Sequence, residues 1–576
     1  MLMRPGLAAT ILIAANLLGC SGSSNNSESA DDEIFTLEFG IKIFRFRWTD
    51  FPGATYYRIL ENPDGLSGFT QISGDIAPGV EVFEHRVALY RRSNARYILQ
   101  KCDTGGCADW ASLDITGHLA AAIGYVKAGN PSEEDFFGEH VSLSDDGTLL
   151  VVGAAREDSS TSGINSTPDD LSLDTGAVYI FRENLGSWSQ EAFIKAGTSW
   201  SPMYFGRSVS LSGDGNTLAV GTQWDVGGFV AGVFIFRHDG TGWAQETFVQ
   251  SPIAEFMDEF SHSISLSNDG NTLAVGAYRE DSATTGIDSI PDEMAPDSGA
   301  AYVFTRSAGI WTQQAYIKAG NTGGGDWFGY SVSLSGDGDT LAVGAINEDS
   351  ATNGIDSTAD EKATDSGAVY LFRRNGTAWS QQSYIKAGNT GSEDRFGWSV
   401  GLDGDGSTLV VGAFGEDSAS SGIDSAADEL AEDAGAAYVF ARVGGNWSQQ
   451  AYIKSDNTAK SDFLGYSVSL SEDGDTLAVG SSQESGSKGG INASPDDNMG
   501  LAGAAYIFSR DAGIWSQQAY VKAKNPDFGD TFGRSVSISG DGETLAAGAD
   551  WEDSSSAGID GTPDELSPEA GAVYLY

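Results

Sequence analysis

The sequence is short of basic residues and proline, and each shortage excludes a class of protein. It has 32 basic against 81 acidic residues, a net charge of −49. Such a chain repels phosphate backbones and anionic headgroups, so we expect no nucleic-acid partner. Proline is scarce at 14 residues while glycine reaches 75, which is typical of many tight turns. Helical periodicity is absent, and no segment after residue 20 is apolar enough to span a membrane.

Histidine is also scarce, and none of the 5 histidines stands in a recognisable nucleophile motif with serine or cysteine. A phosphate-binding glycine turn and a His-Glu-x-x-His motif are both missing. We therefore predict no catalytic residues and no enzymatic activity. Paired carboxylates are abundant, so a polysaccharide hydrolase or lyase on a propeller scaffold stays as an alternative.

Residues 1–20 have the pattern of an export signal. Arg4 precedes an apolar run that is too short to span a bilayer. The run ends in Leu-Leu-Gly-Cys at Cys20, which resembles the lipobox of bacterial lipoproteins. That resemblance implies an acylated Cys20, a membrane contact through the lipid anchor only, and a place in the outer membrane or at the cell surface. An ordinary secretory signal cleaved nearby is the alternative.

Only 3 cysteines occur in the whole chain. With Cys20 assigned to lipid, Cys102 and Cys107 remain, close together in CDTGGC. An exported chain with one such pair predicts a disulfide between them. A zinc site is disfavoured because no histidine stands near the pair.

The chain before residue 118 divides into two further parts. Residues 21–33 are small, polar and acidic, which indicates a flexible tether. Residues 34–117 contain short runs of β-forming residues between turn signals such as NPDG, and these predict a small β-sandwich. The segment resembles a fibronectin type III module, with Trp48 and Tyr97 at two of its core positions. An immunoglobulin-like sandwich would share these features.

Residues 118–576 are periodic. The stretch WFGYSVSLSGDGDTLAVGA at 327–345 returns as RFGWSVGLDGDGSTLVVGA at 395–413. Each copy holds four strand-like runs, so the pattern predicts an all-β fold, a seven-bladed β-propeller behind the sandwich. The first residue of the FG motif recurs every 68 residues, except for one step of 55, at Phe137, Phe205, Phe260, Phe328, Phe396, Leu464 and Phe532.

The last copy of the repeat lacks its fourth strand-like run, and a matching run stands before the first copy. The chain stops at GAVYLY, the third run of the last copy. A fourth run stands instead before the first copy, at residues 121–129, although Ala120 replaces the tryptophan found in other copies. We therefore predict that strand 121–129 closes the ring, which removes an exposed sheet edge.

The paired FG and VGA motifs, over about residues 124–576, resemble FG-GAP repeats, the units of the integrin α-subunit propeller. The resemblance implies a seven-bladed propeller used for extracellular recognition. Phe328 and the glycines Gly329 and Gly344 are then structural positions, suited to packing between blades. The hairpin VSLSGDGDTLAVGA has fewer acids than the calcium loop of that family, so we interpret it as a plain turn.

The acidic residues gather instead in a loop between the second and third runs of most copies. The loop repeats a Glu-Asp, a Gly-Ile-Asp and an Asp-Glu at fixed spacing. Calcium takes six to eight oxygen ligands, so the loops are candidate calcium sites; duplication of an ancestral blade without any such purpose is the alternative. The candidate ligands are Glu280, Asp281, Asp288, Asp292, Glu348, Asp349, Asp356, Asp360, Glu416, Asp417, Asp424 and Asp428.

Together these features predict a surface-anchored, non-catalytic binding or adhesion protein. Its propeller would present loops to a protein or glycan ligand, with calcium as the only candidate cofactor. A purely architectural envelope lipoprotein is the second alternative.

Overall fold

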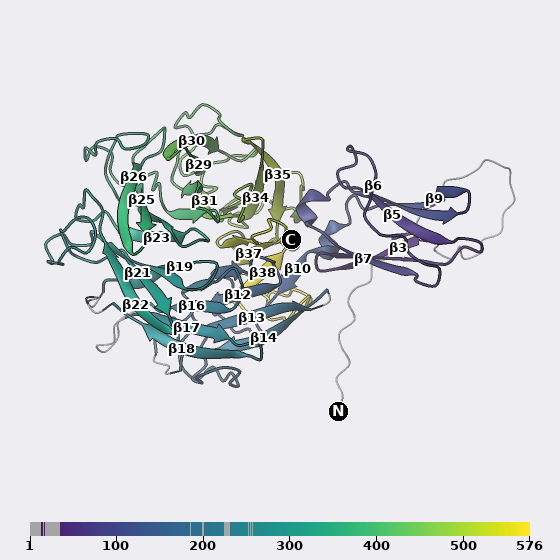
Figure 1. Ribbon diagram of the computed structural model, residues 1–576, viewed down its shortest axis with the longest axis horizontal. Coiled ribbons are helices and arrows are strands. Elements are labelled where there is room, and N and C mark those ends of the chain that lie inside the picture. Colours follow the sequence, from purple (N-terminus) through teal and green to yellow (C-terminus); the bar gives the residue numbers. More distant parts are fainter. Residues whose placement is uncertain are drawn as a thin grey trace.

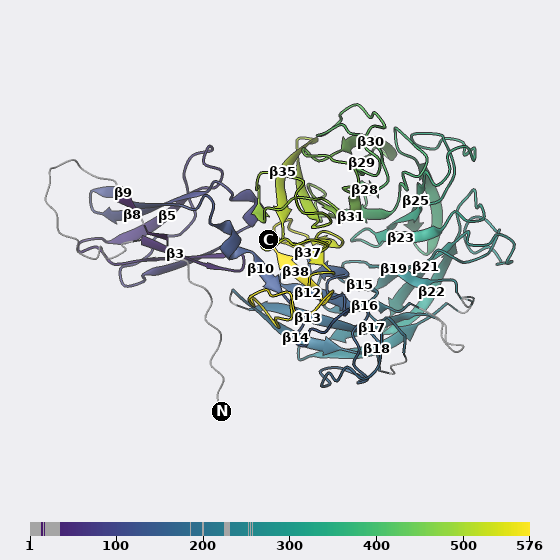
Figure 2. The same ribbon diagram turned by 180° about the vertical axis from the view of Figure 1, so that it is seen from behind.

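The computed structural model describes residues 13–14, 16–17, 35–184, 186–197, 201–223, 231–251, 253, 255 and 257–576. Within these residues, helix is limited to two short 3-10 turns, η1 (Leu89–Arg91) and η2 (Leu119–Ala122). None of the helices described there has the length and apolar character needed to cross a bilayer. Figures 1 and 2 show a small purple sandwich beside a large ring of sheets coloured from blue to yellow.

The sandwich consists of two antiparallel sheets. One sheet contains, in spatial order, β1 (Ile13–Ala14), β3 (Phe35–Gly40), β4 (Ile43–Trp48) and β7 (Val82–Arg86). The other contains β2 (Asn16–Leu17), β9 (Gly106–Asp114), β8 (Arg96–Asp103), β5 (Tyr56–Asn62) and β6 (Thr70–Gln71). The backbone of β1 and β2, from the predicted leader, thus pairs with an edge of each sheet.

Alternation along β4 explains the sandwich core. Phe44, Phe46 and Trp48 point inward and are buried, while Arg45 and Arg47 point outward. This period of two is the pattern of a half-buried strand. Trp48 packs against Tyr57 of the opposite sheet at 5.7 Å between ring centroids, so the two sheets share one aromatic core.

Seven four- or five-stranded antiparallel sheets follow one another in the described part of residues 124–576. From innermost to outermost strand they are β11 (His140–Leu143), β12 (Leu149–Ala154), β13 (Ala177–Asn184) and β14 (Ser187–Ile194); β15 (Ser208–Leu211), β16 (Thr217–Gly221), β17 (Val233–His238) and β18 (Trp243–Val249); β19 (Phe260–Leu266), β20 (Thr272–Ala277), β21 (Ala300–Ser307) and β22 (Ile310–Ile317); β23 (Phe328–Leu334), β24 (Thr340–Ala345), β25 (Ala368–Asn375) and β26 (Ala378–Ile385); β27 (Ser399–Leu402), β28 (Thr408–Ala413), β29 (Ala436–Val443) and β30 (Asn446–Ile453); β31 (Leu464–Leu470), β32 (Thr476–Ser481), β34 (Ala504–Asp511) and β35 (Ile514–Lys522), with β33 (Gly490–Ile491) beside β35; and β36 (Val536–Ile538), β37 (Leu545–Ala549), β38 (Ala572–Leu575) and β10 (Gly124–Val126).

The glycines of the repeat let neighbouring sheets touch through their backbones. A Cβ on Gly344, in the VGA motif of one sheet, would lie 2.2 Å from the carbonyl oxygen of Gly397, in the FG motif of the next. The same contact occurs between Gly548 of the last sheet and Gly138 of the first, at 2.0 Å. A side chain on the VGA glycine would collide there, which is why that motif keeps glycine. At the FG position, glycine suits the positive φ of the backbone, which is 96° at Gly397.

The last sheet is completed by residues from before the first copy. β10 pairs with β38, and Tyr125 lies opposite Tyr574 in the register. The innermost strands of the last and first sheets are also joined, because the N–H of Val141 donates to Ser535 Oγ at 3.0 Å. Of the strand predicted at 121–129, the structure has β10 alone, directly after the 3-10 turn η2, and β10 lies where the two ends of the repeat meet.

The sandwich contacts hairpin turns between innermost and second strands. The Tyr90 hydroxyl donates to the Gly542 carbonyl, and the Lys42 amine donates to Thr544 Oγ1. Arg86 donates to the Gly147 carbonyl of another such turn at 3.1 Å and forms an ion pair of 2.5 Å with Glu183 of β13. These turns follow the innermost strands, whereas the FG motifs precede them. The sandwich also reaches the loop of the sixth copy, because Ser93 and Asn94 line a pocket with residues 489–493.

Candidate functional site

The glutamates of the acidic loops are buried and paired with lysines. Each glutamate accepts one hydrogen bond from the lysine ammonium of the YIK segment in its own sheet. It accepts a second one from the tyrosine hydroxyl of the same segment. The pairs are Glu280 with Lys318 at 2.7 Å, Glu348 with Lys386 at 3.0 Å and Glu416 with Lys454 at 2.8 Å. The tyrosine hydroxyls are those of Tyr316 at 2.6 Å, Tyr384 at 2.7 Å and Tyr452 at 2.7 Å. These residues, predicted as calcium ligands, thus anchor the loops to the sheets.

The aspartates of the loops accept backbone N–H groups. Asp281, Asp349 and Asp417 accept from Asp297, Asp365 and Asp433, each at 2.8 Å. Asp288, Asp356 and Asp424 accept from Tyr316, Tyr384 and Tyr452 at 3.0, 3.0 and 2.9 Å. Asp292, Asp360 and Asp428 accept from Ala283, Ala351 and Ala419 at 2.8, 2.9 and 2.8 Å. The repeated spacing in the sequence therefore specifies how each loop folds.

These contacts decide how well the loops fit calcium. The three glutamates do not fit, because a buried ammonium within 3.0 Å repels a second cation. Asp281, Asp288 and Asp292 keep Oδ2 without a hydrogen bond in the described part of the chain. Across the described residues, no group of three or more His, Cys, Asp or Glu side chains is placed to hold a metal ion.

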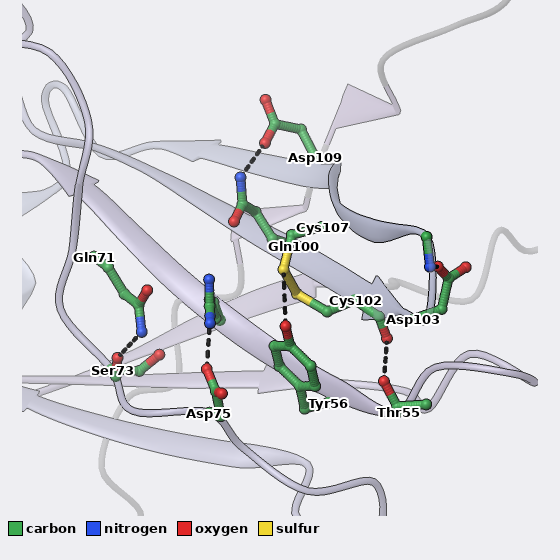
Figure 3. Close-up of a disulfide and its surroundings, with 12 residues drawn as sticks. Thr55, Tyr56, Gln71, Ser73, Asp75, Gln100, Cys102, Asp103, Cys107 and Asp109 are labelled. Carbon is green, nitrogen blue, oxygen red and sulfur yellow. Dashed lines mark hydrogen bonds and ion pairs between the residues drawn. A yellow bond between two sulfur atoms is a disulfide. The ribbon is translucent and has the colours of Figure 1, made fainter.

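Cys102 and Cys107 form a disulfide that links β8 to β9, with sulfurs 2.00 Å apart. Figure 3 shows this bond beside the Tyr56 hydroxyl, which lies 3.5 Å from the Cys107 sulfur. The bond links the two strands of the last hairpin of the sandwich. Cys20, the predicted lipid-bearing residue, lies outside the described residues.

A cavity of about 230 Å³ opens at the FG end of the ring, between the seven innermost strands. Sequence reasoning treated the FG motif as purely structural and missed this cavity. The missed signal is a single position, the residue directly after the FG motif, which varies while its neighbours repeat. In chain order this position holds Glu139, Arg207, His262, Tyr330, Trp398, Tyr466 and Arg534, and all seven line the cavity.

Four consecutive sheets give the cavity an aromatic arc. His262 and Tyr330 have ring centroids 4.7 Å apart, and Tyr330 and Trp398 lie 4.8 Å apart. Tyr466 continues the arc at 5.4 Å from Trp398. Just behind it, Phe414 packs against Trp398 at 4.5 Å and fixes that ring in place.

The other three sheets give the cavity a charged arc. Arg207 pairs with Glu139 at 3.1 Å and also lies 3.0 Å from His140 Nε2. Arg534 pairs with the buried Asp550 at 3.0 Å. Burial raises the pKa of Asp550 to about 6, although Arg534 opposes that shift.

Both histidines at the cavity are neutral at pH 7. Burial and the nearby Arg207 lower the pKa of His140 to about 3 and hold the pKa of His262 well below its usual range. His262 Nδ1 is buried and has no hydrogen-bond partner within the described residues. A buried polar atom without a partner is costly, and a bound ligand would satisfy it.

Below the cavity, at the other end of the innermost strands, the hairpin turns join one another around the axis. Backbone hydrogen bonds run from turn to turn around the axis, for example from Asn268 N–H to Gly336 O at 2.9 Å. The Asp541 N–H donates to the Asp145 carbonyl at 3.1 Å, which links the last turn to the first. The turn end of the ring is therefore held together by hydrogen bonds, whereas the cavity opens at the FG end.

The repeated tryptophans have a structural role. The indole N–H of Trp379 donates to Gln314 of the preceding sheet at 2.9 Å, and that of Trp515 donates to Gln450 at 2.8 Å. Both indoles are buried. In these copies the tryptophan of the W-x-Q motif thus ties its outermost strand to the outermost strand of the preceding sheet.

Several solved structures resemble the chain distantly. The RRP9 WD40 repeats share 9% identity with a TM-score of 0.42, over 78% of this chain and 96% of that one. A hypothetical selenium-binding protein from Sulfolobus tokodaii shares 8% identity with a TM-score of 0.40, over 83% and 96%. TolB from Acinetobacter baumannii shares 10% with a TM-score of 0.32, over 76% and 78%. Scores this low carry no argument about function.

No curated protein matches the chain at a significant level. The model of the FG-GAP repeat matches residues 188–235, 311–372, 379–440, 447–508 and 515–576, which is just over half of the chain. Each match begins at a W-x-Q tryptophan and runs through the FG and VGA motifs that join one sheet to the next. The chain therefore belongs to the family of FG-GAP repeat β-propeller proteins.

Proposed function

We propose that this protein is a surface-anchored, non-catalytic binding protein whose seven sheets are the blades of one closed propeller. Its ligand, a protein or a glycan, binds at the cavity between the blades. One observation carries the proposal: the repeat keeps its structural positions but varies the residue after each FG motif, and that residue faces the cavity. Variation at one inward position of a uniform scaffold is expected of a binding site.

The proposed anchoring follows from the amino-terminal segments. Acylation of Cys20, the tether at 21–33 and a fibronectin type III-like sandwich would hold the propeller at the outer membrane or cell surface. The sandwich contacts support this arrangement, because Tyr90 and Lys42 bind turns at the end of the ring opposite the cavity. The cavity would then face away from the anchor.

The chemistry of the cavity favours binding over hydrolysis. Among the described residues that line it, Glu139 is the only carboxylate, and it is already paired with Arg207. A glycosidase commonly uses two carboxylates across the scissile bond. A polysaccharide hydrolase or lyase and a purely architectural protein remain the alternatives.

We propose only the loop aspartates as calcium ligands, since the loop glutamates are paired with lysines. The free Oδ2 atoms of Asp281, Asp288 and Asp292 would each have to bind calcium separately, with backbone carbonyls and water as the other ligands, because no three acidic side chains of the described residues come together. Calcium added to chelated protein should then raise the melting temperature. An unchanged melting curve would remove calcium from the proposal.

Two measurements test the proposed function. Membrane fractionation of cells that express the wild type or Cys20→Ser should show that only the wild type sediments with the membranes. Binding of the purified protein to cell-surface proteins and to a glycan array should weaken on Trp398→Ala. Enzymatic activity against a polysaccharide panel would contradict the proposal. So would a Trp398→Ala variant that binds its ligand as tightly as the wild type.

A further inference from the structure

The cavity presents two chemically different halves to one ligand. Its aromatic arc is formed by four consecutive blades and its charged arc by the other three. A ligand that fills it must therefore have an apolar face on one side and hydrogen-bonding groups on the other. Nothing wholly apolar or wholly polar would satisfy both halves.

The aromatic arc suits the C–H face of a sugar ring. Tyr330, Trp398 and Tyr466 form a continuous wall of rings, with neighbouring centroids 4.8 and 5.4 Å apart. The hydroxyls of Tyr330 and Tyr466 have no hydrogen bond within the described residues, so they are available to ligand oxygens. A pyranose combines an apolar face with hydroxyls at its edge, which is what this wall can meet.

The charged arc suits hydroxyl groups and not an anion. Arg207 and Arg534 are each neutralised, by Glu139 at 3.1 Å and by Asp550 at 3.0 Å. The site therefore has no uncompensated positive charge to hold a carboxylate or sulfate, and the net charge of −49 repels polyanions. The terminal N–H groups of Arg534, the Glu139 carboxylate and the free Nδ1 of His262 offer both donors and acceptors.

The shape of the cavity favours the end of a glycan as ligand over an internal segment of it. Innermost strands surround it on every side, and the hydrogen-bonded turns from Asp145 to Asp541 join one another below it. Its volume of about 230 Å³ is smaller than the roughly 300–1,000 Å³ typical of drug-sized ligands. A single ring can enter along the axis, but a polysaccharide cannot pass through.

We infer that the cavity binds the terminal residue of an uncharged glycan end-on, with the sugar ring stacked on Trp398 and its hydroxyls bound by Arg534 and Glu139. This inference rests on the proposed binding function and specifies its ligand class. It makes a free, neutral chain end the recognised feature.

The test uses the full-length protein and a glycan array in which each neutral glycan is paired with the same glycan capped by sialic acid. Soluble methyl glycosides of glucose, galactose, mannose and N-acetylglucosamine, with the matching uronic acids, are then titrated while tryptophan fluorescence is followed. We expect saturable binding of at least one neutral end, loss of that binding on capping, and binding at least about tenfold weaker to the matching uronic acid.

Variants connect the binding to the cavity. Trp398→Ala and Arg534→Gln should each weaken neutral-glycan binding about tenfold or more. Because Arg534→Gln leaves the buried Asp550 without its partner, its melting temperature should fall, and binding is measured well below the unfolding transition of each variant. Phe528→Ser is the matched control, because Phe528 is 70% exposed and lies outside the cavity; its binding should equal that of the wild type.

Two outcomes would overturn the inference. Preference for sialylated or uronic ends would show an anion site instead. If no glycan binds while binding to a surface protein still depends on Trp398, the inferred glycan ligand is wrong but the proposed binding function stands. If no ligand of either class depends on Trp398, both fail together.

Discussion

The carboxylate of Glu348 lies 3.0 Å from the ammonium of Lys386, and both side chains are buried within one blade. The pair recurs as Glu157 with Lys195, Glu280 with Lys318, Glu416 with Lys454, Glu484 with Lys522 and Glu552 with Lys127. The last pair joins the two ends of the repeat region, because Lys127 precedes the first copy and Glu552 belongs to the last. A repeated motif that looked like a ligand set is thus a repeated ion pair.

Breaking one of these pairs should destabilise the protein strongly. Glu348→Gln or Lys386→Met alone leaves a buried partner without its counter-charge, and we expect a loss of about 3–5 kcal/mol. The double variant Glu348→Leu/Lys386→Met removes both charges and should recover most of that loss. Chemical denaturation of the three variants measures the difference.

The exposed pair Lys460–Glu432 is the control, since its side chains are 64% and 67% exposed. Lys460→Ala should leave the denaturation curve unchanged, because water screens an exposed pair. If the Lys460 variant lost as much stability as Lys386→Met, burial would not be the cause.

Contact between blades should make Gly344 intolerant of even one methyl group. In Gly344→Ala the new Cβ would lie 2.2 Å from the Gly397 carbonyl oxygen of the next blade. The blades must separate, and we expect a loss of roughly 1–3 kcal/mol. Gly242→Ala provides the comparison, because a Cβ at Gly242 meets nothing within 4 Å; its melting temperature should equal that of the wild type.

Closure of the ring can be tested locally at Val126. This residue of β10 is buried and lies opposite Val573 of β38. Val126→Asp places an unpaired carboxylate at that seam and should weaken it by roughly 3 kcal/mol. Hydrogen exchange should then accelerate in β38 and not in β24, on the far side of the ring. Equal acceleration in both strands would mean that the ring unfolds as one unit.

The contact between sandwich and propeller should depend on pH through Lys42. Burial lowers the pKa of Lys42 to about 7, helped by Arg86 and opposed by Asp541 and Glu543, from 10.5 in an ordinary lysine. Between those values the unfolded chain binds more protons than the folded one, so the free energy of unfolding rises with pH.

We therefore expect the melting temperature of the wild type to increase from about pH 7 to pH 10. Lys42→Met, which carries no titrating group, should be more stable at pH 7 and should lose that increase. A parallel pH dependence in the two proteins would show that Lys42 keeps an ordinary pKa.

The all-β fold, the repeat and the place of the closing strand could be predicted from the sequence. They depend on local patterns: alternation within each strand, glycine in each turn, and a fixed period between copies. Tyr125 aligns by sequence with the tyrosine of the other YIK segments, and in the folded chain it pairs with Tyr574. Repetition makes such predictions reliable, because the same pattern can be compared at the same position of every copy.

The partners of charged side chains could not be predicted in this way. Glu348 and Lys386 are separated by a whole loop and two strands, and only the folded blade brings them together. The cavity depends on the fold for the same reason. Tyr330, Trp398 and Tyr466 stand 68 residues apart in the sequence and become neighbours only because the blades are arranged in a circle.

The sequence alone thus determined the blade, since alternating side chains and turn glycines act over a few residues. The tertiary structure decided which carboxylates are neutralised and which side chains share a cavity, since both depend on distances between segments remote in the chain. The period of 68 residues specifies the strands of each copy, and the arrangement of the seven innermost strands around one cavity decides which side chains the copies present together.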